Sequence, residues 1–335
     1  MKNVLEWLEA TVEKCPDKPA FSDTESSITF AQVYDIARNA GAYLIEKLGV
    51  DRTPVAVFAG RKMVTPAYFL GVVYAGRPYA PIDASLPDKR IEKILENLCP
   101  GAIVADRESR EHVESIVDEL AKAEGFDRPQ IFIAEDISRF EQVACADSNC
   151  KISESAGDAV TDSENDTDGG VVAGCAGKTD DSSRDMLAVV RRQMSMTDPL
   201  YIIYTSGSTG NPKGVMTSHL SLMTYINAYC DVMHIEESDV LGNQSPLDYI
   251  AAIRDIYLPL KTGCSTAIIP KEYFMEPNAL FDYMNDKKVS SVGWSVSAFT
   301  ILTSLGAFEE VGLKSLRKIC FSGSVMPLSL IHISE

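Results

Sequence analysis

Apolar and polar residues alternate along the chain with the periods of helices and strands. Residues 3–12 carry apolar side chains on one side of a predicted helix, with glutamates between them. Residues 28–44 predict a strand that runs into a second amphipathic helix, and residues 79–83 predict a short apolar strand bounded by proline. Residues 86–88, LPD, then signal the start of a further helix. Strands and helices that alternate in this way predict an α/β fold.

One stretch breaks this pattern. Residues 147–185 run through Ser, Asp, Gly, Thr and Glu with almost no large apolar side chain, and hold ten acidic against three basic residues, a net charge of −7. Such a segment cannot bury enough apolar surface to offset its ordering entropy, so we predict a disordered acidic insertion over 141–185. It divides the core into residues 1–140 and 186–327. It is either a tolerated surface loop or a regulatory or docking segment.

Composition excludes several classes of function. The 335 residues are 45% hydrophobic, which is enough for a sizeable core, and the net charge of −17 argues against nucleic-acid binding, which needs a basic face. No apolar run reaches the length of a membrane span. Eight cysteines at irregular spacing contain no Cys-x-x-Cys pair, so we expect neither a zinc site nor a disulfide framework. We therefore expect a cytoplasmic protein that binds neither nucleic acid nor membrane.

The segment 201–215, YIIYTSGSTGNPKGV, carries the strongest chemical signal, because an apolar strand opens into a loop of glycines, hydroxyl residues and one lysine. Glycines allow positive φ angles that turn backbone N–H groups toward an anion, and Lys213 supplies a point charge for a polyphosphate. The P-loop of kinases has glycine before its lysine and Ser or Thr after it, where this chain has Pro212 and Gly214. A Ser/Gly-rich linker is the alternative interpretation. The predicted phosphate-binding residues are Thr205, Ser206, Gly207, Ser208, Thr209, Gly210, Lys213 and Gly214.

This loop resembles the signature of the adenylate-forming (AMP-binding) superfamily, whose members include acyl-CoA synthetases, luciferases and the adenylation domains of nonribosomal peptide synthetases. Residues 28–44 and 72–95 are similar, in the same order, to the first and second core segments of amino-acid adenylation domains. The resemblance covers residues 1–140 and 186–327. It implies an incomplete large N-terminal domain with stacked α and β layers, similar to peptide synthetase domains and D-alanine carrier-protein ligases.

In that superfamily a substrate carboxylate attacks the α-phosphorus of ATP, in the presence of Mg²⁺, to give an acyl adenylate and pyrophosphate. The acyl group then passes to a thiol, so the resemblance implies a small carboxylic acid substrate and a phosphopantetheinyl carrier protein as partners. By resemblance, Lys213 and His219 are the candidate catalytic residues, although a histidine at a helix start is as often a capping or packing residue. Ser322, Gly323 and Ser324 are expected to lie against adenine or the substrate.

Substrate choice is where the sequence departs from its relatives. Amino-acid-activating members carry Phe-Asp-x-Ser, whose aspartate holds the α-ammonium, and alignment through residues 255–257 puts Ile250 in its place. Asp248 can replace this aspartate only if the segment is not helical, because positions two apart do not share a helix face. Arg254 either binds a second carboxylate or, as we expect, is a surface charge. The predicted pocket residues are Asp248, Ile250, Ala251, Arg254, Gly293, Cys320 and Ser322.

Residues 328–335, LSLIHISE, resemble a translated sequencing-library adapter. We therefore expect a fragment, inactive by itself, whose natural sequence continues beyond Pro327 and contains the magnesium-binding glutamate and a C-terminal catalytic lysine. The resulting hypothesis is a carboxylic acid adenylating enzyme with an amino acid as the leading substrate class. An acyl-CoA or aryl-acid ligase is one alternative, and a noncatalytic nucleotide-binding module is another.

Overall fold

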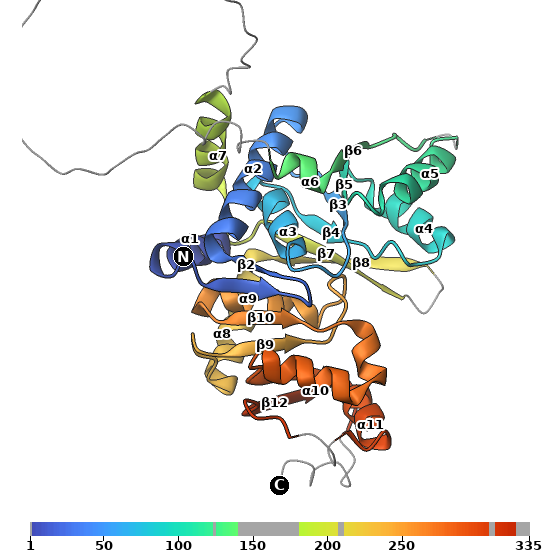
Figure 1. Cartoon of the computed structure of the whole chain (residues 1–335). Coiled ribbons are helices and arrows are strands. Elements are labelled where there is room, and N and C mark those ends of the chain that lie inside the picture. The colour runs from blue at the N-terminus through green and yellow to red at the C-terminus, as the bar shows by residue number, and fades with distance from the viewer. Residues whose placement is uncertain (1, 123–124, 140–180, 207–210, 308–311, 326–335) are drawn as a thin grey trace, which may run out of the picture.

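The computed structural model describes residues 2–122, 125–139, 181–206, 211–307 and 312–325 (Figure 1). Two six-stranded sheets with helices packed on their faces confirm the predicted α/β class. Neighbouring strands are parallel except for one antiparallel pair at an edge of each sheet, β1 with β2 and β7 with β8.

Sheet A has the strand order β12-β11-β9-β10-β1-β2. Its strands are β1 (Pro19–Ser22), β2 (Ser27–Thr29), β9 (Val240–Asn243), β10 (Ser265–Ile268), β11 (Ser291–Ser295) and β12 (Lys318–Ser322). Phe21 of β1 lies opposite Thr266 of β10, so the first strand of the chain completes a sheet built mainly from its last third.

Sheet B has the strand order β6-β5-β3-β4-β7-β8. Its strands are β3 (Val55–Phe58), β4 (Tyr79–Pro81), β5 (Ala102–Ala105), β6 (Gln130–Ile133), β7 (Pro199–Ser206) and β8 (Pro212–Ser218). Within β3, Val55 and Val57 enter one hydrophobic core, whereas Ala56 and Phe58 enter another. Successive side chains of a strand point to opposite faces, so a strand covered on both faces needs a continuous apolar run.

Helices form three layers around these sheets. The helices that share a core with both sheets are α1 (Leu5–Lys14), α2 (Phe30–Leu48), α3 (Thr65–Tyr74), α6 (Ala134–Ile137), α7 (Asp181–Gln193), α8 (His219–Met233) and α9 (Ala252–Thr262). The outer face of sheet B is covered by α4 (Asp88–Leu98) and α5 (Arg110–Leu120). The outer face of sheet A is covered by the 3₁₀ helix η1 (Lys271–Met275), α10 (Pro277–Asp286) and α11 (Val296–Ser304).

Local sequence signals account for several element boundaries. A capping box starts α2, because the N–H of Gln32 donates to Thr29 Oγ1 and the N–H of Thr29 donates to Gln32 Oε1. The helix signalled by residues 86–88 begins at Asp88 as α4. After α3, Gly76 turns the chain toward β4 with φ of 78°, a conformation that glycine adopts readily and other residues rarely do.

The predicted acidic insertion, 141–185, falls mainly outside the described residues. Its last residues, 181–185, form the first part of α7, and the predicted boundary at 185 stays a prediction. This helix lies beside α2 (Figure 1), and Arg191 pairs with Glu9 of α1 at 2.6 Å. Leu187, which is 4% exposed, is the first described side chain of this helix that is buried in the core. The adapter-like residues 328–335 also lie outside the described residues.

Candidate functional site

The predicted phosphate loop lies at the tip of the β7–β8 hairpin. Thr205 pairs with Lys213 across the hairpin, and Thr205 Oγ1 donates to the Lys213 carbonyl at 3.5 Å. The Lys213 side chain is exposed and accessible to an anion. Residues 207–210, which include the predicted ligands Gly207, Ser208, Thr209 and Gly210, lie outside the described residues, as does the side chain of Ser206.

Two expectations for this loop need correction. Residues 212–215 were predicted as loop but belong to β8, which pairs with β7. Gly214 was expected to supply a positive φ, yet its φ lies outside that region. A Cβ at Gly214 would lie 2.9 Å from Ile202 Cγ2 and 3.1 Å from the Tyr204 ring. Glycine is therefore required here by the close approach of the opposite strand, which local sequence does not reveal.

The residues predicted to contact adenine lie on sheet A, whereas the β7–β8 hairpin belongs to sheet B. Ser322 ends β12, and Gly323 follows with φ of 99°. Ser322, Gly323 and Ser324 are all exposed at the C-terminal end of this edge strand.

Three residues predicted to line the acid pocket meet in the structure. Gly293 of β11 lies directly opposite Cys320 of β12 in the parallel register. Arg254, in the first turn of α9, donates from Nη2 to the Gly293 carbonyl, and its Cζ lies 5.7 Å from the centre of the Tyr229 ring. The expectation that Arg254 is a surface charge is wrong, because the residue is only 5% exposed.

A buried polar network holds Arg254 in place. Asp255 accepts from Arg254 Nε at 3.1 Å through Oδ1 and from Asn243 Nδ2 at 3.0 Å through Oδ2. Arg61 Nη2 donates to both oxygens of Asn243 at 2.9 Å. Burial raises the pKa of Asp255. The guanidinium groups of Arg254 and Arg61 and the hydrogen bond from Asn243 act in the opposite direction and lower this pKa. Our sequence reasoning missed Arg61 and Asn243 as parts of this network, although polar residues just after or at the end of buried strands were a usable signal.

The conformation of the segment before α9 bears on the two candidates for the amine site, Asp248 and Ile250. Residues 247–251 form turns, so the helical objection to Asp248 does not apply. Ile250 is 49% exposed, whereas Asp248 is half-buried. Burial raises the pKa of Asp248, and the nearby carboxylate of Asp83 raises it further. Ala251, which was also predicted to line the pocket, lies in the same turn immediately before α9.

Asp248 lines a cleft of about 610 Å³ between the two sheets. Its walls are the segments that follow β1, β3, β4, β9 and β10, and ligands of α/β proteins commonly bind beyond the carboxyl ends of parallel strands. The charged side chains that border it include Arg61, Lys62, Asp83, Asp248, Lys271 and Glu272.

His219 lies away from the exposed face of the hairpin. It is 2% exposed at the start of α8, and its Nδ1 accepts a hydrogen bond from the N–H of Val4 at 3.4 Å. Burial lowers the pKa of His219 to about 4, so the ring is neutral at pH 7. This geometry favours the packing role over the catalytic one.

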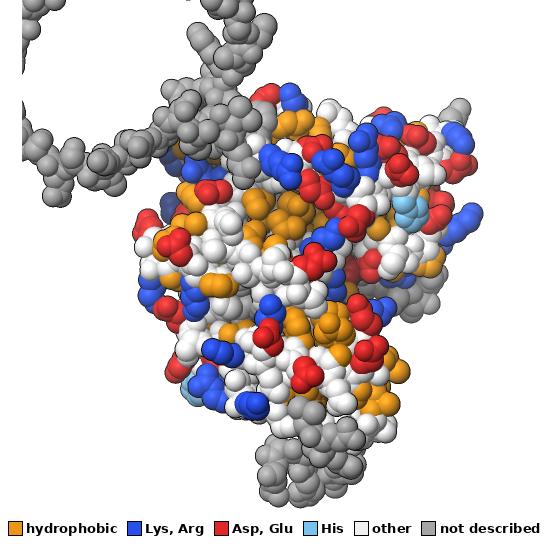
Figure 2. All heavy atoms as spheres, viewed as in Figure 1, with side chains coloured by type: hydrophobic (Ala, Val, Ile, Leu, Met, Phe, Trp, Pro, Cys, Tyr) orange, Lys and Arg blue, Asp and Glu red, His pale blue; other side chains and the backbone are white. Residues whose placement is uncertain are grey.

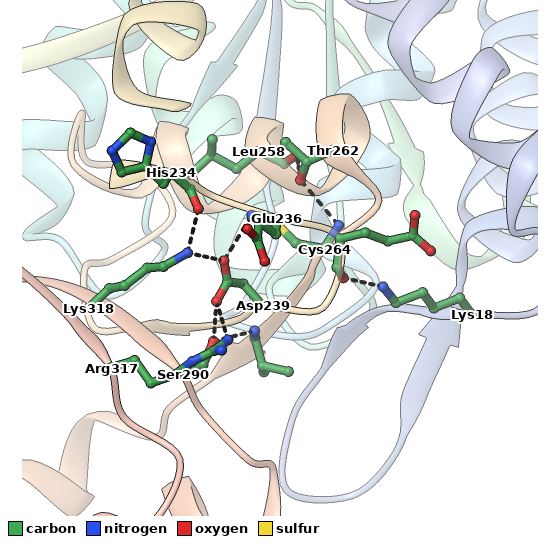
Figure 3. A network of polar contacts seen from close by, with 12 residues as sticks. Lys18, His234, Glu236, Asp239, Leu258, Thr262, Cys264, Ser290, Arg317 and Lys318 are labelled. Carbon is green, nitrogen blue, oxygen red and sulfur yellow. Dashed lines mark hydrogen bonds and ion pairs between the residues drawn. The ribbon is translucent and has the colours of Figure 1, made fainter. Parts of the chain in front are cut away.

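A second buried network lies at the opposite end of sheet A (Figure 3). Asp239 precedes β9 and accepts hydrogen bonds from Ser290 Oγ at 2.7 Å, Arg317 Nη2 at 3.0 Å and Lys318 Nζ at 2.6 Å. Lys18 donates to two carbonyls in the same region, those of Glu237 and Gly263. These residues surround the N-terminal ends of β9, β11 and β12, where a structural role is expected.

Within the described ranges, no three His, Cys, Asp or Glu side chains lie together in a way that could hold a metal, so we assign no magnesium ligand. None of the helices described is both long and apolar enough to cross a membrane. Acidic and basic side chains are interspersed over the face that Figure 2 shows.

The family described as AMP-binding enzyme matches residues 8–333. The D-alanine–D-alanyl carrier protein ligase of Bacillus licheniformis is 25% identical over 98% of this chain and 54% of its own length. The ligase of the same name from Bacillus velezensis is 26% identical over 98% and 54%. The chain therefore spans about half the length of the curated relatives it matches.

Solved structures share the fold. The crystal structure of VinN superposes with a TM-score of 0.72 at 16% identity, over 100% of this chain and 72% of that one. The N-terminal domain of FACL13 from Mycobacterium tuberculosis gives 0.72 at 20% identity, over 100% and 73%. The nonribosomal peptide synthetase FmoA3 in its AMPPNP-bound form gives 0.72 at 20% identity, over 99% and 30%.

Proposed function

Because the chain belongs to the AMP-binding enzyme family, we propose that it is part of an enzyme that uses ATP to convert a carboxylic acid into an acyl adenylate and pyrophosphate. The β7–β8 hairpin carries this proposal, since it presents an exposed lysine beside a loop rich in glycine and hydroxyl residues. The similarity to D-alanine–D-alanyl carrier protein ligases supports transfer of the acyl group to a carrier-protein thiol.

The hairpin residues would hold the nucleotide. ATP, when bound, supplies pyrophosphate as the leaving group. The ammonium of Lys213 neutralises part of the triphosphate charge, which otherwise repels the incoming carboxylate. Thr205, directly across the hairpin, contributes a hydroxyl donor, and the small Gly214 lets the two strands approach closely. The exposed Ser322, Gly323 and Ser324 form the second contact, on the side of adenine or the acid.

An amino acid is the leading substrate class. Asp248 is half-buried beside Asp83 in the cleft, and two neighbouring carboxylates favour an ammonium group between or beside them. Asp248 would thus take the amine in place of the aligned aspartate. The second candidate, an acid without an α-amine such as a substrate of acyl-CoA or aryl-acid ligases, is favoured by Ile250 at the aligned position.

ATP–pyrophosphate exchange on the full-length gene product tests the proposal. Lys213→Ala should lower exchange on the order of a hundredfold with little change in melting temperature, because the side chain is exposed. Lys89→Ala, which removes an exposed lysine on α4, is the matched control and should leave exchange unchanged. ATP binding without exchange for any acid would identify a noncatalytic nucleotide-binding module instead.

A further inference from the structure

The two faces of the β7–β8 hairpin have different surroundings. Residues paired across an antiparallel hairpin lie on the same face, and successive residues alternate between the faces. Thr205 and Lys213 are one such pair, and both are exposed. The adjacent pair, Tyr204 and Gly214, therefore lies on the opposite face, where Tyr204 packs against the core that α4 and α5 form on sheet B and Pro212 is buried. The face that carries Lys213 is thus open, whereas the other face is covered.

The helix α4 makes a hydrogen bond to the hairpin on each side of residues 207–210. On β7, the hydroxyl of Tyr204 donates to Asn97 Oδ1 at 2.9 Å. Directly before β8, Asn211 Oδ1 accepts from Lys93 Nζ at 3.2 Å. Lys93 and Asn97 are four positions apart, so they project from the same face of α4. One face of this helix therefore holds both stems of the hairpin.

Gly214 allows the first of these hydrogen bonds. A Cβ at this position would lie 3.1 Å from Cζ of Tyr204 and 3.2 Å from its hydroxyl oxygen. The hydroxyl is the group that reaches Asn97, so a side chain at position 214 would displace it from its acceptor. Gly214 thus leaves space for the contact with α4 on one face of the hairpin, while its neighbour Lys213 occupies the other.

We propose that Lys93 and Asn97 are positioning residues that hold the hairpin so that Lys213 faces the triphosphate of ATP. This inference rests on the proposed function, because it assigns a task to residues that support the nucleotide site. Neither residue contacts the nucleotide, and they act through Asn211 and Tyr204. A hairpin that is fixed before ATP binds loses less conformational freedom on binding, so loss of these contacts should weaken ATP more than the acid.

Pyrophosphate exchange on the full-length gene product tests the inference through two Michaelis constants. Asn97→Leu and Lys93→Met should each raise KM for ATP about three- to tenfold, and KM for the acid should change less than about twofold. Asn97→Asp keeps an acceptor and Lys93→Arg keeps a donor, so both should retain most of the parent affinity for ATP. Lys89→Met, which removes an exposed lysine one turn earlier on α4, is the matched control and should leave both constants unchanged.

A second set of variants separates the hydrogen bond from general damage to the fold. Tyr204→Phe keeps the ring and removes the hydroxyl, so it should raise KM for ATP as much as Asn97→Leu does. The two substitutions break the same hydrogen bond, and the double variant should therefore be no worse than either single one. Additive effects, equal rises of KM for ATP and for the acid, or a KM for ATP equal to that of Lys89→Met would each overturn the inference.

Hydrogen–deuterium exchange on the 335-residue chain supplies a readout that does not need activity. Backbone amides of β7 and β8 should exchange faster in Asn97→Leu/Lys93→Met than in the parent chain, whereas those of the buried strand β3 should not. Unchanged exchange in the hairpin would overturn the inference. Faster hairpin exchange in this variant, together with no pyrophosphate exchange by the parent protein for any acid, would support the role of α4 and refute the proposed adenylation.

Discussion

Lys318 Nζ, at the start of β12, donates a 2.6 Å hydrogen bond to Oδ2 of Asp239, whose side chain is completely buried. Arg317 and Ser290 bind the other carboxylate oxygen, and the N–H of Glu236 binds Oδ2 (Figure 3). One aspartate thereby ties the edge strand β12 to β9 and β11 at the N-terminal end of sheet A. The side chains of Arg317 and Lys318 are partly exposed, so water can hydrate either of them if its partner is lost. The Asp239 carboxylate is completely buried and cannot be hydrated in the same way.

Asp239→Asn should therefore lower the free energy of unfolding by about 2 to 4 kcal/mol, because it removes a buried ion pair while keeping the size of the side chain. Urea unfolding at pH 7 measures this change. Lys14→Ala is the matched control, since it breaks an exposed pair with Glu237 in the same region and should cost little. A loss as small as that of the control would show that the network does not hold β12.

Asp239 should also make part of the free energy of unfolding dependent on pH in the acidic range. Burial alone would raise the pKa of Asp239, but hydrogen bonds from Glu236, Lys318 and Ser290 outweigh it and lower the pKa below its ordinary value. A depressed folded pKa stabilises the protein above the unfolded value, near 3.9, and this stabilisation is lost as the pH falls through the folded value. Unfolding free energies measured from pH 5 down to pH 2 should fall less steeply in Asp239→Asn than in the parent protein.

The buried His219 should cause a second loss of stability on acidification, at a higher pH than the loss caused by Asp239. Its pKa falls to about 4 because of burial, so the unfolded chain binds a proton between about pH 6.5 and pH 4 that the folded chain excludes. As the pH falls from about 6.5 to about 4, the free energy of unfolding should therefore fall by up to about 3 kcal/mol. His219→Gln should flatten the profile between pH 6.5 and 4 while leaving the Asp239 transition below pH 4 in place. Loss of pyrophosphate exchange at unchanged stability would instead assign His219 a catalytic role.

The Arg254–Gly293 pair predicts strong coupling between two substitutions. Gly293→Ala should destabilise the protein by about 1 to 3 kcal/mol, because the new methyl group overlaps the guanidinium. Arg254→Ala removes the guanidinium that the new methyl group would overlap. In that background, Gly293→Ala should therefore cost at least about 1 kcal/mol less than it does in the parent protein. A double-mutant cycle in urea measures this difference. Additive effects would mean that Arg254 leaves this place in solution.

The hydroxyl groups of Tyr79 and Tyr257 link sheet B to α9. Their oxygens are 3.1 Å apart, and both side chains are fully buried. Tyr79→Phe should cost about 1 to 3 kcal/mol, because it leaves the Tyr257 hydroxyl buried without its partner. Tyr79→Phe/Tyr257→Phe removes both polar groups and should regain most of that loss, as thermal unfolding of the three variants can establish. A double variant less stable than the single one would contradict this reasoning.

Elements with local signals were predictable from the sequence. The capping box at Thr29, the proline before Asp88 and the glycine turn at Gly76 act within a few residues of the chain, so each can be read without knowing the fold. The buried strand β3 was equally open to prediction as a continuous apolar run. Position 213 was predicted as a phosphate ligand for the same reason, because its neighbours are adjacent in sequence.

What the sequence by itself determined is therefore the α/β class and many of its elements, and it predicted Lys213 as a phosphate ligand. Only the tertiary structure decided that Arg254 is buried, because the carbonyl that accepts its hydrogen bond belongs to Gly293, 39 residues away. The steric role of Gly214 likewise depends on the opposite strand, and the network around Asp239 joins residues up to 79 positions apart. Burial and pairing of charges depend on contacts between distant segments, and local sequence carries no record of those contacts.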